Sequence, residues 1–171
     1  ILNGALLDSE KYEQELFGEE KSDGSISYGA LEVNKSIEIN FNKKDEEILL
    51  ECDKEQISRV FINLIKNSIE SIEQKVEKNP DFKKKILIDI SSNNDHILIS
   101  IEDNGVGFDK NNIEEILNPY YTTKKNGTGL GLSIVNKIIN DHKGELKFIP
   151  INNGAKIQIR FYLNDNRNIN S

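Results

Sequence analysis

Several residue types are missing or rare in this chain, and each absence excludes something. The 171 residues include no tryptophan, no methionine and one cysteine, Cys52. One cysteine excludes an intramolecular disulfide framework and a cysteine-built zinc site. Since the first position is not methionine either, we expect a fragment or a processed chain. No run of 18 apolar residues occurs, so the sequence predicts no membrane-spanning helix, and a fragment leaves its parent's topology open.

Positive charge is also scarce. Lysine and arginine number 22 against 29 acidic residues, which gives a formal net charge of −7. Nucleic acid and anionic membrane surfaces require a concentrated basic face, whereas the basic residues here are scattered along the chain. We therefore expect no nucleic-acid partner. The length suits one domain that can bury a substantial core.

Residue periodicity predicts an α+β domain between two weakly patterned ends. Near the N-terminus, Glu10–Phe17 predicts a short helix and Gly18–Gly29 a polar, glycine-rich loop, while the tail 164–171 should be frayed. A long helix is expected over 54–78 with Asp53 as N-cap and Gln56 in the capping-box position. A second helix is expected over Ser133–Asn140. Strand patterns occupy Ser36–Phe41, Ile48–Cys52, Ile86–Ile90, Ile97–Ile101, Glu145–Ile149 and Ala155–Leu163. The first two are joined by a charged turn, and the next two form a hairpin. One sheet with helices over one face is the simplest assembly.

The long helix carries two asparagines that invite a reason. Asn63 and Asn67 are four residues apart, so they share one flank beside the apolar stripe. Asparagine forms helices poorly because its side chain competes for backbone hydrogen bonds. Amide oxygens are hard, neutral ligands that could hold Mg²⁺ against nucleotide phosphates. A solvated face in an asparagine-rich sequence is the alternative, and the helix alone favours it.

A carboxylate and two glycines follow the hairpin in the run Asp103-Asn104-Gly105-Val106-Gly107. The carboxylate could accept a hydrogen bond from the exocyclic amine of adenine, while the glycines let the backbone approach a flat ligand. Guanine would present a carbonyl oxygen there, so such a site would reject it. An ordinary Asp-Asn-Gly turn is the alternative.

A glycine-rich run, Gly127-Thr128-Gly129-Leu130-Gly131-Leu132, leads into the second helix. Alternating glycines before a helix expose backbone N–H groups to an anion, and the helix dipole adds to the attraction. The spacing is not the dinucleotide fingerprint G-x-G-x-x-G. A flexible linker is the alternative, and the apolar Leu130 and Leu132 argue against it.

Taken in order, these motifs resemble the boxes of the GHKL (Bergerat-fold) ATPases, and among them the histidine kinases. The segment from Asn63 to Ser68 resembles the N box, that from Asp103 to Gly107 the G1 box, and that from Gly127 to Leu132 the G2 box. Pro119-Tyr120-Tyr121-Thr122-Thr123-Lys124 resembles the F box, with tyrosine in place of the usual phenylalanine, and Gly154-Ala155 matches a terminal glycine motif. The run 119–132 looks most like the nitrogen-regulation group of sensor kinases.

The resemblance implies a two-layer α/β sandwich with a mixed, mostly antiparallel sheet and a flexible ATP lid between Phe108 and Gly127. It implies that Asn67 binds Mg²⁺, that Asn63 supports the metal and phosphates, and that Lys124 or Lys125 reaches the γ-phosphate of ATP. Residues expected to contact the nucleotide are Asp103, Gly105, Gly107, Tyr120, Thr123, Lys124, Lys125, Gly127, Thr128, Gly129, Leu130, Gly131 and Leu132.

Two positions bear on the expected reaction. In hydrolysing members such as DNA gyrase, a water-activating glutamate stands where this chain has Asn63, which cannot act as a base at neutral pH. The resemblance therefore implies phosphoryl transfer. Glu70 stands where many kinases have lysine or arginine, so a second phosphate contact is expected from the lid instead.

The resemblance also divides the chain and implies its partners. Residues 1–35 would lead from a missing dimerisation domain, 36–163 form the catalytic domain, and 164–171 are a tail. Neither His96 nor His142 resembles the phosphoacceptor, so the acceptor histidine is expected on the dimerisation domain, with a response regulator receiver domain downstream. We expect a monomeric, cytoplasmic fragment of a homodimeric parent, and anchoring of that parent in the bacterial inner membrane stays open. A GHKL ATPase or anti-sigma-type serine kinase and a degenerate nucleotide-binding scaffold are the alternatives.

Overall fold

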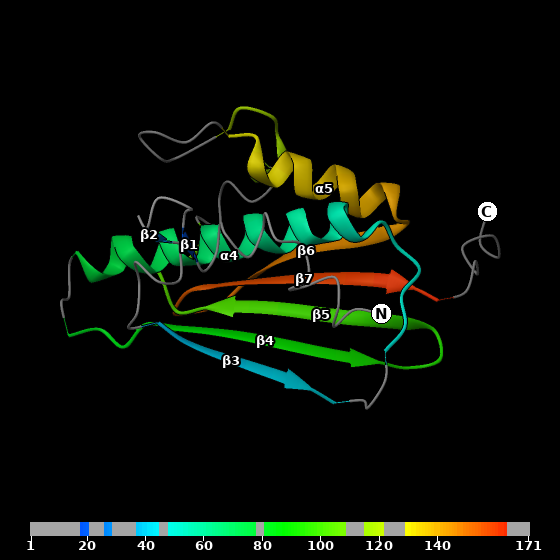
Figure 1. Cartoon of the computed structure of the whole chain (residues 1–171), viewed down its shortest axis with the longest axis horizontal. Helices are drawn as coiled ribbons and strands as arrows, with labels where there is room; N and C mark the ends of the chain where they lie inside the picture. The colour runs from blue at the N-terminus through cyan, green and yellow to red at the C-terminus, as the bar shows by residue number, and fades with distance from the viewer. Residues whose placement is uncertain are drawn as a thin grey trace.

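The computed structural model describes residues 18–20, 26–28, 37–44, 48–77, 81–108, 115–121 and 129–163. Within them, a five-stranded sheet has the strand order β3-β4-β5-β7-β6. Strand β3 is parallel to β4, and the other neighbours are antiparallel. Helices α4 and α5 lie over the same face of this sheet (Figure 1). The predicted two-layer sandwich with a mixed, mostly antiparallel sheet is confirmed.

The bounds of the elements agree closely with the predicted ones over most of the domain. The strands are β3 (Glu38–Lys43), β4 (Lys85–Ser92), β5 (His96–Asp103), β6 (Gly144–Pro150) and β7 (Ala155–Tyr162). The helices are α4 (Lys54–Val76) and α5 (Gly131–Asp141), with a 3-10 turn, η2, at Glu115–Leu117. A separate antiparallel ribbon pairs β1 (Gly18–Glu20) with β2 (Ile26–Tyr28). No helix in these described ranges is long and apolar enough to cross a membrane.

The core lies between the sheet and the two helices. Alternate residues of the central strands point at the helices, which explains the isoleucine alternation in the sequence. On β4 and β5 these are Ile86, Ile88, Ile90, Ile97, Ile99 and Ile101, all buried. Strand β7 adds Ile157, Ile159 and Phe161, and α4 adds a buried stripe that includes Ile57, Val60, Leu64 and Ile72. Helix α4 contacts the central strand β5, while α5 contacts α4 and β6. This packing fixes where the end of β5 lies beneath α4.

Two local predictions are wrong. Residues 48–52 form no strand, because β3 pairs in parallel with β4 rather than folding back on this segment. The apolar residues of this segment have another cause: Ile48 is buried in the core while Leu49 is 58% exposed, as the chain runs along the core into α4. The predicted loop 18–29 contains the paired strands β1 and β2, whose backbone pairing its polar composition does not reveal. The predicted helix 10–17 and the tail 164–171 lie outside the described residues.

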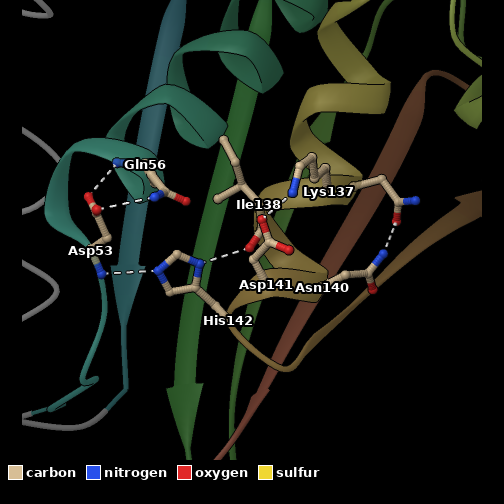
Figure 2. A network of polar contacts seen from close by, with 8 residues as sticks. Asp53, Gln56, Lys137, Ile138, Asn140, Asp141 and His142 are labelled. Carbon is tan, nitrogen blue, oxygen red and sulfur yellow. Dashed lines mark hydrogen bonds and ion pairs between the residues drawn. The ribbon is translucent and has the colours of Figure 1, made fainter.

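The start of α4 is tied to the end of α5 (Figure 2). Asp53 is the N-cap, as predicted: its Oδ1 accepts a hydrogen bond from Gln56 N at 3.0 Å. In a capping box the third residue would also satisfy the cap's own N–H. Here Gln56 Nε2 donates to Asp53 Oδ2 at 3.2 Å, and Asp53 N donates to His142 Nε2 at 3.0 Å. His142 Nδ1 lies 2.8 Å from Ile138 O, so the ring is held at both nitrogens in a structural role.

Candidate functional site

The candidate site lies where β5 ends beneath the C-terminal half of α4. Asp103 is the last residue of β5 and pairs with Ala155, the first residue of β7. The residue is only 5% exposed. An aspartate is rarely this buried unless other groups satisfy it, so the donors around it define what it can bind.

Burial and hydrogen bonds act on Asp103 in opposite directions. Desolvation raises the pKa of its carboxyl group and is the largest influence on it. Hydrogen bonds from Gly105 N, Ser68 and Ser71 lower the pKa, and the net shift remains upward. Gly105 N donates to Oδ1 at 2.9 Å, and Ser71 Oγ lies 3.3 Å from the same atom. The carboxylate is therefore fixed by neutral donors, and no cation is among the groups that shift its pKa.

The backbone after Asp103 packs against α4 at a distance that only glycine allows. A Cβ on Gly105 would lie 2.6 Å from Ile72 N and would also strike Ser71. Val106 N donates to Ser71 O at 3.2 Å, which ties this loop to the helix main chain. Gly107 has a φ of 80° and a Cβ there would strike the carbonyl oxygen of Gly154. Both glycines are therefore required by the packing of this loop against α4 and Gly154, and the predicted approach of the loop to a flat ligand stays a prediction.

The N box and the G2 box meet across α4 and α5. A Cβ on Gly131, the first residue of α5, would lie 3.1 Å from Asn63 Oδ1. Asn63 Nδ2 donates to Arg59 O at 2.8 Å, so the amide is oriented with its oxygen toward α5. Asn67 is half-buried one turn further along α4, toward Ser71 and Asp103. Helix α4 therefore carries two amide side chains between the loop that follows Asp103 and the glycine-rich segment at the start of α5.

The start of α5 is suited to an anion. Leu130 is the N-cap residue and makes no side-chain capping hydrogen bond, and no acidic residue stands in the first turn. The partial positive charge of the helix N-terminus is therefore not offset locally. The side chain of Leu132 is partly buried and packs against the core. A phosphate group is the natural ligand for such an end.

The base of the predicted lid is partly described. Tyr120 N donates to Gly129 O at 3.1 Å, so the two residues that flank 121–128 are joined. Tyr120 is 76% exposed, with a φ of 68°. The other predicted contacts in this stretch lie outside the described residues and stay predictions: Thr123, Lys124, Lys125, Gly127 and Thr128.

A divalent cation at this site would depend on amide and phosphate oxygens. Within the described ranges, no cluster of three or more His, Cys, Asp or Glu side chains could hold a metal ion. Mg²⁺ commonly binds through few protein ligands together with waters and substrate phosphates. Asn63, beside the start of α5, and Asn67, one turn further along α4, carry amide oxygens that fit that kind of site.

Sequence reasoning missed two residues, Ser71 and Lys75. Both continue the four-residue spacing of Asn63 and Asn67 along α4, so all four side chains share one flank of the helix. Ser71 contacts Asp103 and Gly107, and Lys75 contacts Asn104 and Gly105. Extending the asparagine flank by two more turns would have found both.

Comparisons with known proteins show the family to which this chain belongs. Residues 52–165 match the family of histidine kinase-, DNA gyrase B- and HSP90-like ATPases. Sporulation kinase C of Bacillus subtilis is 36% identical over 122 residues, which cover 71% of this chain and 26% of that protein. Nitrogen regulation protein NtrY of Azorhizobium caulinodans is 38% identical over 111 residues, covering 63% of this chain and 14% of that protein. This chain thus spans about a quarter or less of either relative.

A solved structure shares the fold. The nucleotide-free catalytic domain of histidine kinase ThkA aligns with a TM-score of 0.65 at 30% identity, covering 76% of this chain and 81% of that domain. The likeness to the nitrogen-regulation group is confirmed, and sporulation kinases share it. The chain therefore belongs to the family of histidine kinase-, DNA gyrase B- and HSP90-like ATPases, as an ATP-binding catalytic domain of the histidine kinase type.

Proposed function

We propose that this domain binds Mg·ATP and transfers its γ-phosphate to a histidine on the dimerisation domain of a parent kinase. The observation that carries the proposal is the buried carboxylate of Asp103, held beside a backbone layer that only glycine permits. Along α4 from this carboxylate lie Asn67 and then Asn63, whose amide oxygen faces the start of α5. This order matches the base, the metal and the phosphates of one extended nucleotide.

Asp103 selects the base in this proposal. Its fixed carboxylate would accept a hydrogen bond from the adenine amine, and the loop through Gly105 and Gly107, packed on α4 and Gly154, would lie beside the ring. Guanine would place a carbonyl oxygen against the carboxylate, leaving two acceptors face to face. A buried acceptor left without a donor costs on the order of 1–3 kcal/mol, which is enough to discriminate between the bases.

The phosphates lie between α4 and α5 in this proposal. The first turn of α5 attracts phosphate through its N–H groups and its dipole. Asn63 and Asn67 would hold Mg²⁺, which when bound neutralises phosphate charge. Phosphoryl transfer needs positioning and charge neutralisation more than covalent chemistry from the protein. Asn63 has no basic atom that could take a proton from water, which favours transfer to an acceptor over hydrolysis.

The partners follow from this assignment. The acceptor histidine would lie on the dimerisation domain of a homodimeric parent, and its phosphate would pass to an aspartate of a response regulator receiver domain. This chain by itself would be a monomer, acting on the cytoplasmic side. Sedimentation at micromolar concentration gives a monomer if this is correct, and a stable dimer contradicts it.

Calorimetric titration with ATP and with GTP, each with and without Mg²⁺, tests the site directly. We expect Mg²⁺-dependent binding that prefers ATP. The reaction is then tested with the chain fused to the dimerisation helices of its parent, using ATP labelled at the γ-phosphate. Acid-labile label on histidine supports the proposal. Acid-stable label on serine would indicate a serine kinase, steady phosphate release an ATPase, and absence of binding a degenerate scaffold.

A further inference from the structure

The last turn of α4 sends a lysine into the loop that follows Asp103. Lys75 Nζ donates to Asn104 O at 2.7 Å and to Gly105 O at 3.0 Å. The ammonium group also lies 4.6 Å from the ring centroid of Phe82, in the segment that leads into β4. Lys75 is half-buried, so these contacts are screened less by water than those of a surface lysine. Two carbonyl oxygens and an aromatic face thus surround one cation.

The two carbonyl groups belong to peptides whose N–H groups are also bonded. The peptide that joins Asn104 to Gly105 gives its oxygen to Lys75 and its N–H to Asp103 Oδ1, at 2.9 Å. The next peptide gives its oxygen to Lys75 and the N–H of Val106 to Ser71 O, at 3.2 Å. A peptide bonded at both ends cannot rotate without breaking a bond. Lys75 therefore fixes two successive peptide planes.

The first of these peptides links the lysine to the carboxylate. A cation bound to a carbonyl oxygen polarises the whole peptide, which makes its N–H a stronger donor. That N–H is the one that orients Asp103. Asn104 holds the other side of the loop, since its Oδ1 accepts from Lys85 N at 2.9 Å and its Nδ2 donates to Lys83 O at 2.7 Å. The side chain of Asn104 fixes the loop to the sheet, while Lys75 fixes its peptides to the helix.

We propose that Lys75 is a positioning residue for base recognition, acting on Asp103 through the peptide between Asn104 and Gly105. It does not touch the nucleotide in this arrangement. It keeps the carboxylate in place before ATP arrives, so the loop does not have to be ordered by binding. The inference rests on the proposed adenine site, and it adds a residue outside the recognised boxes.

A helix-stabilising role is the competing explanation, because a cation in the last turn favours any helix. A double-mutant cycle separates the two roles. We expect Lys75→Met to weaken ATP binding by about 5- to 30-fold in the intact protein, less than the loss of the Asp103 hydrogen bond itself, because the lysine acts only through the peptide. In the Asp103→Ala background the same change should have almost no further effect, because the group it positions is gone.

Three further variants complete the experiment. Lys75→Arg should restore most of the affinity, since a guanidinium group also donates to two carbonyls. Phe82→Leu should give a smaller loss in the same direction. Lys137→Met, on the exposed side of α5, removes a helix lysine remote from the loop and should leave ATP binding unchanged. If Lys75→Met does not fold, Lys75→Gln replaces it in the same cycle.

The outcomes distinguish this inference from the proposed function. If the intact protein binds ATP and Asp103→Ala weakens that binding to a still measurable level, but Lys75→Met binds normally, the positioning role is wrong and the adenine site stands. Equal losses from Lys75→Met in both backgrounds would assign it a general structural role. If the intact protein does not bind ATP, the proposed function fails first. A lower preference for ATP over GTP in Lys75→Met would place the defect at the base.

Discussion

The two ends of α4 use similar polar contacts for different purposes. At its start, Gln56 donates to the Asp53 carboxylate and the Asp53 N–H donates to His142, so the contacts join one helix to another. At its end, Ser71 and Lys75 meet the backbone after Asp103, so the contacts join the helix to a candidate binding loop. The first set lies far from every predicted site residue along the helix. Long-range hydrogen bonds alone therefore do not mark a functional site, and what they hold in place decides their role.

Among substitutions that compare the two ends of α4, Asp103→Asn should have the largest effect on ATP binding. The amide retains an acceptor for Gly105 N but also presents donors, which would face the adenine amine. We expect ATP affinity to fall by about 10- to 150-fold, or roughly 1.5–3 kcal/mol. Unfolding at pH 7 should become no easier, because the change removes a desolvated charge. Calorimetry and urea unfolding measure the two quantities, and a parallel loss of stability would contradict the separation.

The pH dependence gives a second test, because ATP affinity and protein stability should respond to the ionisation of Asp103 in opposite directions. Burial raises the pKa of Asp103, so the accepting carboxylate is lost at a higher pH than for an exposed aspartate. Below that pKa, ATP affinity should fall by about tenfold per pH unit beyond the nucleotide's own titration. Stability behaves in reverse: the contribution is present below the unfolded pKa and is lost as pH rises through the raised folded value. Asp103→Asn is the control, and its two profiles should lack both components.

At the start of α4, Asp53→Ala should affect stability alone. Removing an N-cap side chain costs roughly 1 kcal/mol, within a range of about 0.5–2 kcal/mol. ATP affinity should stay within twofold of the wild type, as judged by calorimetry. A tenfold loss of affinity would show that the two ends of α4 are coupled.

His142→Ala should have a somewhat smaller effect at the same end. It removes the acceptor of the Asp53 N–H and the contact to Ile138 O, with an expected cost of about 0.5–1.5 kcal/mol. The accepting Nε2 must be unprotonated, so a charged ring cannot make this contact. Urea unfolding measures the cost, and an unchanged midpoint would mean that water replaces the imidazole.

Lys137→Ala should have the smallest effect of these substitutions on unfolding free energy. The side chain pairs with Asp141 at 2.7 Å, but the two side chains are 74% and 51% exposed. Exposed pairs four residues apart on a helix contribute about 0.3–0.5 kcal/mol. We expect a change in unfolding free energy no larger than that, and none in ATP binding. A larger loss would mean that the end of α5 depends on this pair.

The elements that could be predicted from the sequence are those with a local signal, such as alternating isoleucines or a helix-capping residue. Isoleucine alternation predicted β4 and β5, and the capping residue predicted where α4 starts, because both signals depend on local geometry. The parallel pairing of β3 with β4 could not be predicted, since the apolar run 48–52 also has a strand-like composition but pairs with neither strand. The predicted motifs lie together in part: Asn63 approaches Gly131, and Asp103 lies under α4. Ser71 and Lys75 were missed because serine and lysine are ordinary residues for a helix surface, and only the loop packed on them distinguishes them.

The cap of α4 also bears on the order in which this chain folds. One of its hydrogen bonds is local in sequence, because Asp53 and Gln56 are three residues apart and can meet as soon as the helix begins. The other hydrogen bond, from Asp53 N to His142, joins residues that are 89 positions apart in the sequence. Closing so long a loop is entropically costly until the intervening sheet has brought its ends together. The first turn of α4 can therefore form early, but its leading amide should gain protection from hydrogen exchange only after α5 has docked.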